Sequence, residues 1–323
     1  MSSVAPPADH PLLQQIRLLS TSVPLAACTH CRLVRSQDRG ANYTLDLYEE
    51  LSATPATALT DNVAADNGDN LGNHVMRVVK CKKGGMPWRS GYDMYLSPSL
   101  LAGSLSSSSA ATNLLPPASS GLLVGRVVPT TVGGVYTILQ RSLSDDYCSS
   151  QPLLLDGGED GESPQIQWQE VCAVQYHAHV LGSTGPREMT VVVHAVDDSG
   201  LPPVADTCTT KSLIDRYRCG ADTDPGIVPL INKPPIFISE TASFALDFGP
   251  RVNTRSVKNF QLIHPHDKDY IVMQFGKSGP DSFALDIRFP MSPVMALGIA
   301  ITSLDRKVIY NLSLPFFSSS SDR

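Results

Sequence analysis

The sequence predicts a mainly β protein in which a closed antiparallel β-barrel surrounds one apolar helix near the C-terminus. Three observations lead to this fold class. Apolar residues make up 42% of the 323 residues and charged residues only 17%, so the chain can bury a large core. Gly and Pro are frequent, with 23 and 25 residues, which is typical of short strands joined by turns. Segment 290–304 contains no charged residue.

Segment 290–304 predicts a helix that protein covers on every side. Its apolar side chains would be spread around the helix instead of forming one stripe. They are Leu297, Ile299, Ala300, Ile301 and Leu304. At about 1.5 Å per residue the segment extends about 22 Å, shorter than the roughly 30 Å of a bilayer core. Pro290 and Pro293 are expected in its first turn, where proline is tolerated. The preceding strands must therefore enclose the helix, and closure would remove their exposed edges.

Apolar and β-branched residues predict strands along most of the chain. The expected strands lie in 32–48 (a hairpin), 75–83, 91–97, 124–139, 170–180, 189–196, 236–248, 256–264, 270–275 and 282–289. Segment 124–139 is expected to turn at Gly133 and Gly134. Three segments, near 51–73, 101–121 and 156–164, lack apolar periodicity and are expected to be disordered insertions.

The cysteines and the N-terminus predict a cytoplasmic protein. Seven cysteines without regular spacing argue for a reduced compartment and against a secreted disulfide framework. Asp9 stands where a secretory leader would be basic. Segment 12–19 is expected to form a short amphipathic helix that packs against the domain. We expect no transmembrane segment, so any membrane contact would be peripheral.

The strongest functional feature is a basic segment between Asn70 and Tyr92, which contains no Asp or Glu. Its cations are Arg77, Lys80, Lys82, Lys83 and Arg89. Strand alternation would place Lys80 and Lys82 on one face, with Lys83 and Arg89 flanking a Gly-Gly turn. Because the net charge of the protein is −6, this cluster predicts a local site for a concentrated anion. The alternative is a solvated charged hairpin.

The expected strength of such a site is limited. Each Lys or Arg near an anionic surface contributes about 1 kcal/mol, so five cations contribute roughly 5 kcal/mol. That corresponds to dissociation constants between high micromolar and millimolar. A second attachment to the membrane is therefore expected.

Other motifs predict neither a metal site nor a catalytic site. Residues 28–31 (CTHC) have zinc-knuckle spacing without a matching second pair. Segment 264–269 contains His and Asp but is expected to be a hairpin turn. His177 and His179 lack a third ligand, and 276–278 (GKS) lacks the first glycine of a phosphate loop. No Ser or Cys nucleophile has a His partner by motif, so we expect no enzyme and no cofactor.

Three segments resemble the tubby-like protein family. The most specific likeness is at the C-terminus, in 256–261 (SVKNFQ) and 269–277 (DYIVMQFGK). Segment 173–190 resembles the middle strands of the family, and 31–47 is similar to its first strand pair. The three segments occur in the family's order.

The resemblance implies one domain with family-like boundaries. Residues 1–27 would be a short N-terminal extension, and 28–310 would form a barrel of about twelve strands around a C-terminal helix. Residues 311–323 would be an additional tail.

The resemblance also implies a non-enzymatic adaptor that binds the headgroup of phosphatidylinositol 4,5-bisphosphate. The expected headgroup-binding residues are Lys80, Lys82, Lys83, Arg89, Arg35, Arg39 and Arg126. Two further cations of the family pattern are replaced here by Val128 and Val135. Their loss would lower the affinity or shift the headgroup preference.

Family likeness further implies a monomer held peripherally at the anionic inner leaflet of the plasma membrane. It would link membrane-protein cargo to trafficking into cilia or flagella, although no basic amphipathic helix of the family's trafficking type precedes residue 28. Two alternatives are a transcription regulator released from the membrane and a scramblase-like lipid-binding barrel. The first would need a broad basic face, which is not visible in the sequence, so we expect no nucleic-acid binding. The second would need palmitoylation-type cysteine clusters and a terminal membrane helix, and their absence from the sequence counts against it.

Overall fold

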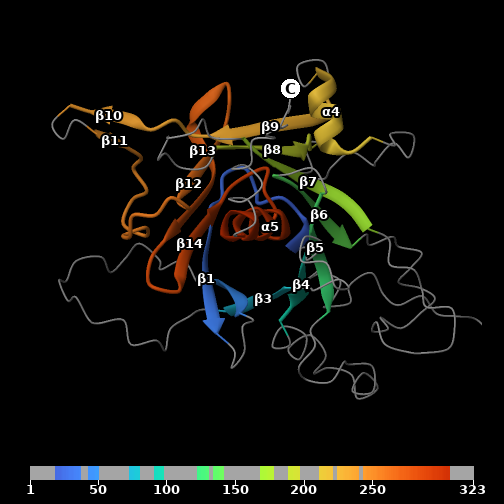
Figure 1. The fold of residues 1–323 in the computed structure, drawn as a ribbon, viewed down its shortest axis with the longest axis horizontal. Coiled ribbons are helices and arrows are strands. Elements are labelled where there is room, and N and C mark those ends of the chain that lie inside the picture. Colours follow the sequence, from blue (N-terminus) through green and yellow to red (C-terminus); the bar gives the residue numbers. More distant parts are fainter. Residues whose placement is uncertain are drawn as a thin grey trace, which may run out of the picture.

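Twelve antiparallel strands close into a barrel around helix α5 (Figure 1). The computed structural model describes residues 19–37, 43–50, 73–80, 91–97, 122–130, 134–141, 168–177, 188–196, 211–220, 224–239 and 243–305. The order around the barrel is β1 (Thr29–Gln37), β14 (Ser282–Ile287), β13 (Asp267–Lys277), β12 (Phe260–His264), β9 (Ile227–Asn232), β8 (Met189–His194), β7 (Trp168–Tyr176), β6 (Val135–Arg141), β5 (Leu123–Pro129), β4 (Tyr92–Leu96), β3 (Asn73–Lys80) and β2 (Tyr43–Glu49). β2 pairs with β1 and completes the ring. The predicted fold class is confirmed.

Helix α5 (Pro293–Leu304) lies inside the barrel, as predicted from its lack of charge. Residues from Val294 to Leu304 are all buried, so no side of the helix faces solvent. Ser292 caps the helix, because its Oγ accepts a hydrogen bond from the Met295 N–H (3.3 Å). Pro293 stands in the first turn, whereas Pro290 precedes the helix instead of belonging to it. Glycine at 298 allows close packing, since a Cβ there would lie 2.8 Å from Ile138 Cδ1.

Polar contacts hold both ends of α5 in the barrel. At its end, the Thr302 hydroxyl lies 2.9 Å from the Tyr176 hydroxyl, and the Tyr136 hydroxyl donates to Asp305 (3.3 Å). Before its start, Val23 N–H donates to the carbonyl oxygen of Met291 (2.8 Å). Segment 19–27 therefore closes the barrel end at which α5 begins, and Leu19 and Val23 belong to the core. No helix in the described part of the chain is long and apolar enough to cross a membrane.

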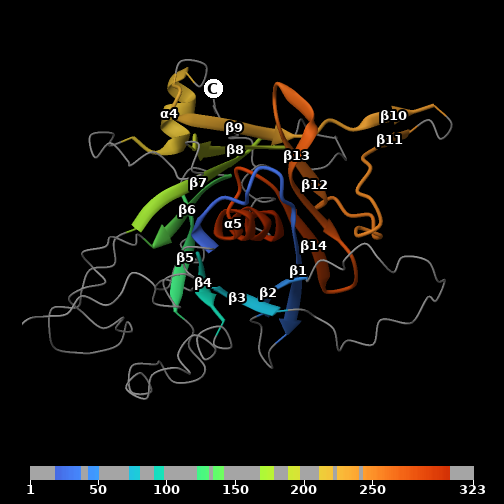
Figure 2. The ribbon, with the colours of Figure 1, turned by 180° about the vertical axis from the view of Figure 1, so that it is seen from behind.

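Two elements of the chain were not predicted. Helix α4 (Leu213–Gly220) covers the outer face of β7, β8 and β9 (Figure 2). It buries only Leu213 and Ile214, so it has little apolar periodicity to detect. Strand β9 contains Pro229, which normally argues against a barrel strand. Pro229 is tolerated in β9 because only Ile231 and Asn232 pair with β12, so position 229 needs no N–H for that pairing.

The prediction of a single strand over 236–248 is wrong. Instead of one barrel strand, this segment contains two short strands, β10 (Ile236–Ile238) and β11 (Ser243–Ala245). They pair only with each other and form a small sheet that projects from the barrel (Figures 1 and 2). We call this sheet the arm. Residues 246–259, which lead from the arm back to β12, are called the strap.

Candidate functional site

Strand order decides which connections share an end of the barrel. β3 ends at Lys80, and the register pairs Lys80 with Tyr92 at the start of β4. Because neighbouring strands are antiparallel, the β1–β2, β5–β6, β7–β8, β9–β12 and β13–β14 connections leave from the same end as β3–β4. We call this the Lys80 end. The β2–β3, β4–β5, β6–β7, β8–β9 and β12–β13 connections leave from the opposite end.

The connections at the two ends differ in charge. The β3–β4 connection (81–91) contains Lys82, Lys83 and Arg89 and no acidic residue. At the opposite end, the connections 51–72 and 142–167 contain Asp and Glu but no Lys or Arg. The side chains of Lys82, Lys83, Arg89 and Arg39 lie outside the described residues, so only their place in the connectivity is known. Basic sequence therefore gathers at the Lys80 end.

Lys80 follows the inward-facing residues of β3. Met76 and Val78, four and two residues before it, are fully buried in the barrel. The ammonium group of Lys80 lies 5.4 Å from the centre of the Tyr92 ring, a cation–π distance. Tyr92 is itself buried. Lys80 thus lies at the rim of the barrel, with its ammonium group next to the Tyr92 ring.

Arg35 also belongs to the Lys80 end. In the register, Arg35 lies opposite Leu45, and Leu45 lies opposite Val78 of β3. Leu45 and Val78 face the barrel interior, so Arg35 and Lys80 lie on the inward-facing side of their strands, at the strand ends. Arg35 Nε and Nη2 donate to Asp281 Oδ1 at 2.8 and 2.5 Å. The side chains of this pair are 37% and 56% exposed, so the pair contributes at most about 1 kcal/mol. An approaching anion can compete for Arg35.

Arg126 is not brought together with Lys80. It faces outward on β5, where its Nε donates to Asp93 Oδ1 (2.6 Å). Its guanidinium also stacks over Trp168, 4.9 Å from the ring centre. These contacts connect β4, β5 and β7 on the outside of the barrel. Val135, where the family pattern has a cation, is buried with Leu213 under α4.

The structure also forms a Ser–His–Asp chain that sequence spacing did not reveal. Ser97 Oγ lies 2.8 Å from His74 Nδ1, and His74 Nε2 lies 3.1 Å from Asp46 Oδ1. Arg77 Nε donates to the same Asp46 oxygen (2.7 Å). The three partners come from separate strands or strand ends, so no local motif exists. Ser97 is fully buried, which leaves its hydroxyl no access to a substrate. The chain is therefore structural.

We expect Asp46→Asn to lower the free energy of unfolding at pH 7 by about 2–3 kcal/mol. Burial alone would raise the pKa of Asp46, but hydrogen bonds from His74 and Arg77 lower the pKa below its usual value. A lowered carboxyl pKa stabilises the fold above the unfolded pKa of about 3.9 and loses this effect as pH falls through the folded pKa. The loss caused by Asp46→Asn should therefore shrink in acid.

Urea unfolding at neutral and acidic pH measures this effect. Asp281→Asn is the matched control, because its carboxylate is exposed and should matter little. A loss for Asp46→Asn that does not change with pH would contradict the assignment.

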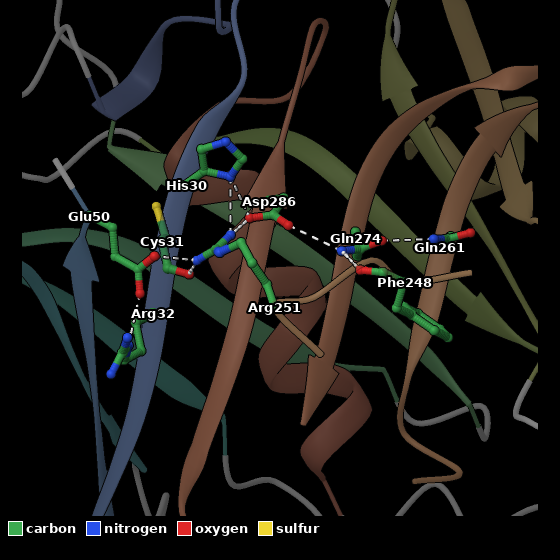
Figure 3. A network of polar contacts seen from close by, with 9 residues as sticks. All are labelled: His30, Cys31, Arg32, Glu50, Phe248, Arg251, Gln261, Gln274 and Asp286. Carbon is green, nitrogen blue, oxygen red and sulfur yellow. Dashed lines mark hydrogen bonds and ion pairs between the residues drawn. The ribbon is translucent and has the colours of Figure 1, made fainter. Parts of the chain in front are cut away.

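A polar network covers the outer face of β1, β14, β13 and β12 (Figure 3). One side chain from each strand forms a row across the register. The row is His30, Asp286, Gln274 and Gln261. Gln274 Nε2 donates to Asp286 Oδ2 (3.1 Å), and Gln261 Nε2 donates to Gln274 Oε1 (2.7 Å).

Arg251 of the strap is the centre of this network (Figure 3). It forms an ion pair with Asp286 and donates to Glu50 Oε2 (2.6 Å), to the carbonyl oxygen of Cys31 (3.0 Å) and to His30 Nδ1 (3.1 Å). Burial and the nearby Arg251 charge lower the pKa of His30, which favours the neutral ring that can accept from Arg251.

The C-terminal sequence signature holds the strap. Gln261 Nε2 donates to the carbonyl oxygen of Asp247 (2.6 Å), and Gln274 Nε2 donates to that of Phe248 (2.9 Å). Asn259 Nδ2 donates to the carbonyl oxygen of Thr254 (2.9 Å). Gly276 leaves room for Val252, whose side chain would lie 2.5 Å from a Cβ at position 276. These residues of the C-terminal signature therefore fix the path of the strap along the barrel.

Among the described residues, no group of three or more His, Cys, Asp or Glu side chains is arranged to hold a metal ion. In the CTHC segment, burial raises the pKa of the Cys31 thiol to about 12, while His30 joins the Arg251 network. His264 pairs in register with Asp267, so this segment is a tight hairpin, as predicted.

Comparison with known proteins gives a consistent result. Residues 107–306, more than half of the chain, match the Tub family model. Tubby protein homolog 1 of Caenorhabditis briggsae is 40% identical over 181 residues, which cover 51% of this chain and 42% of that protein. Tubby-related protein 3 of Homo sapiens is 40% identical over 186 residues, with 57% and 39% covered. Tubby-related protein 1 of Mus musculus is 34% identical over 186 residues, with 57% and 32% covered.

The matched region contains β5 to α5, and β1 to β4 complete the barrel before it. The chain aligns with less than half the length of these relatives. A family match over most of the chain, together with a closed barrel around an apolar helix, establishes that this protein belongs to the Tub family.

Proposed function

We propose that this protein is a non-enzymatic adaptor that binds phosphatidylinositol 4,5-bisphosphate at the Lys80 end of its barrel. The observation that carries the proposal is the charge difference between the two ends. Lys80 and the acid-free connection with Lys82, Lys83 and Arg89 lie at one end. At the opposite end, connections 51–72 and 142–167 contain acidic residues without Lys or Arg, and the β8–β9 connection contains more Asp residues than cations. Such a difference orients an acidic protein toward an anionic surface.

The available groups suit a polyphosphate headgroup. Lysine ammonium groups act as point charges on phosphate, and arginine binds it with two parallel hydrogen bonds. Arg35 can exchange its exposed pair with Asp281 for a phosphate, and Arg39 lies in the adjacent β1–β2 connection. Arg126 faces outward and pairs with Asp93, so we assign it to barrel stability.

Membership of the Tub family supports an adaptor role. We propose that the protein is a cytoplasmic monomer that attaches reversibly to the inner leaflet of the plasma membrane. Bound there, it would connect membrane-protein cargo to a trafficking complex that serves cilia or flagella. Opposite charge at the two ends supports this arrangement, because the acidic end would face away from the lipid.

Vesicle sedimentation tests the headgroup site. Phosphatidylcholine vesicles with and without the bisphosphate lipid are compared for wild type and for Lys80→Ala plus Lys82→Ala. Two cations at about 1 kcal/mol each predict a roughly 30-fold loss of affinity. The charge-matched control is Lys211→Ala plus Lys268→Ala, since both lysines lie at the opposite end. Equal losses in the two variants, or binding that ignores the bisphosphate, would contradict the site.

A further inference from the structure

The arm projects from the barrel (Figures 1 and 2), in a connection that leaves at the Lys80 end. It belongs to the β9–β12 connection, which leaves the barrel after Asn232 and returns at Phe260. Ile236 and Phe237 are 66% and 55% exposed. They are consecutive residues of β10, so they point to opposite faces of the two-stranded sheet. Each face of the arm therefore presents a largely exposed apolar side chain at these positions.

Exposed apolar residues concentrate at this same end. The large hydrophobic side chains that are exposed in the described chain are Leu25, Val79, Ile236, Phe237 and Val257. Val79 directly precedes Lys80 on the outer face of β3. Val257 lies in the strap turn 254–258, which is joined to the end of β13 by the hydrogen bond from Thr254 N–H to the carbonyl oxygen of Lys277 (3.1 Å). Only Leu25 lies at the opposite end, before β1.

Cations accompany these apolar side chains. Lys233 precedes the arm, and Arg255 and Lys258 flank Val257 in the strap turn. Apolar side chains mixed with Lys and Arg are typical of surfaces that lie in the boundary between lipid headgroups and acyl chains. Segment 233–259 contains more cations than acidic residues, so its charge complements an anionic surface. Together with the exposed apolar side chains, this charge favours an anionic bilayer.

The strap keeps this surface in place. Arg251, Gln261 and Gln274 hold its backbone against the barrel immediately after the arm. An isolated pair of strands is only marginally stable, so fixed attachment at its base favours presentation of the arm over its collapse.

We propose that the arm and the strap turn insert their exposed apolar side chains into the interface of an anionic bilayer. This inference rests on the proposed function. Insertion would supply the second attachment to the membrane that is expected because the cations alone bind weakly. The bound headgroup and the inserted side chains then lie at the same end of the barrel.

The test separates headgroup binding from insertion. Ile236→Ser plus Phe237→Ser is compared with Leu25→Ser, an equally exposed leucine at the opposite end. Calorimetry with soluble inositol trisphosphate measures the headgroup site without a bilayer. The arm variant should bind it as wild type does, yet bind bisphosphate vesicles at least tenfold more weakly. Leu25→Ser should match wild type in both assays.

A second measurement does not depend on affinity. Tryptophan fluorescence of Phe237→Trp should be quenched by anionic vesicles with brominated acyl chains, and more strongly than that of wild type. Unchanged vesicle binding of the arm variant, or no additional quenching, would overturn the insertion and leave the arm to a protein partner. Failure of soluble headgroup binding in wild type would instead overturn the proposed function, since quenching by anionic vesicles reports on the arm separately.

Discussion

Ile299→Ala should lower the free energy of unfolding by about 2–5 kcal/mol. Ile299 lies in the middle of α5 and is fully buried within the barrel core. Removing its side chain forfeits apolar burial and leaves a cavity. The closed ring of strands restricts collapse around that cavity, so the loss should fall in the upper part of the range. Guanidinium unfolding followed by circular dichroism measures the change.

Ile236→Ala is the matched control, because it deletes the same atoms from a side chain that is 66% exposed. Its free energy of unfolding should change by no more than about 0.5 kcal/mol. Similar losses for the two substitutions would mean that α5 is not enclosed as described. The same measurement on Ile236→Ser plus Phe237→Ser checks that the arm variant folds normally, which the membrane experiments require.

Arg251→Met should lower the free energy of unfolding by about 2–4 kcal/mol. The substitution keeps apolar bulk but removes the donors to Glu50, Asp286 and the Cys31 carbonyl group. Burial alone would raise the pKa of Glu50, and hydrogen bonds from Arg32 and Arg251 lower it instead. Without Arg251, a half-buried carboxylate loses part of its compensation, and the strap loses its central contact.

Arg255→Met is the control for Arg251→Met, since Arg255 is an exposed arginine of the same strap. It should change stability by no more than about 0.5 kcal/mol. Arg251→Met should also raise the pKa of His30, because the Arg251 charge helps to lower it. Titration of the His30 ring by NMR checks this direction. An unchanged His30 pKa would contradict the network geometry.

Local patterns were sufficient to predict the main architecture. The charge-free segment 290–304 predicted the enclosed helix, because a helix with no polar side must be covered wherever it lies. Strand patterns identified most of the barrel. They failed at β9, because Pro229 is unusual in a barrel strand. They also failed at the arm, because Ile236 and Phe237 are apolar but exposed.

The candidate site was predictable only in its residue types. Lys80 and its neighbours in the sequence indicated an anion site, because an acid-free group of cations is a local property. Arg126 was grouped with them, yet it faces outward and pairs with Asp93. Ser97, His74 and Asp46 meet from three separate strands or strand ends, so no spacing along the chain could reveal them.

The sequence by itself determined that this protein encloses an apolar helix in a β-barrel and carries one concentrated basic segment. Only the tertiary structure decided which connections share an end, that Arg251 joins β1 to β14, and that the arm and the basic segment leave the same end of the barrel from opposite sides of the ring. The physical reason is that composition and periodicity act within a few residues. Barrel closure, in contrast, depends on the pairing of β1 with β14, whose residues are about 250 positions apart, and it places distant side chains next to one another.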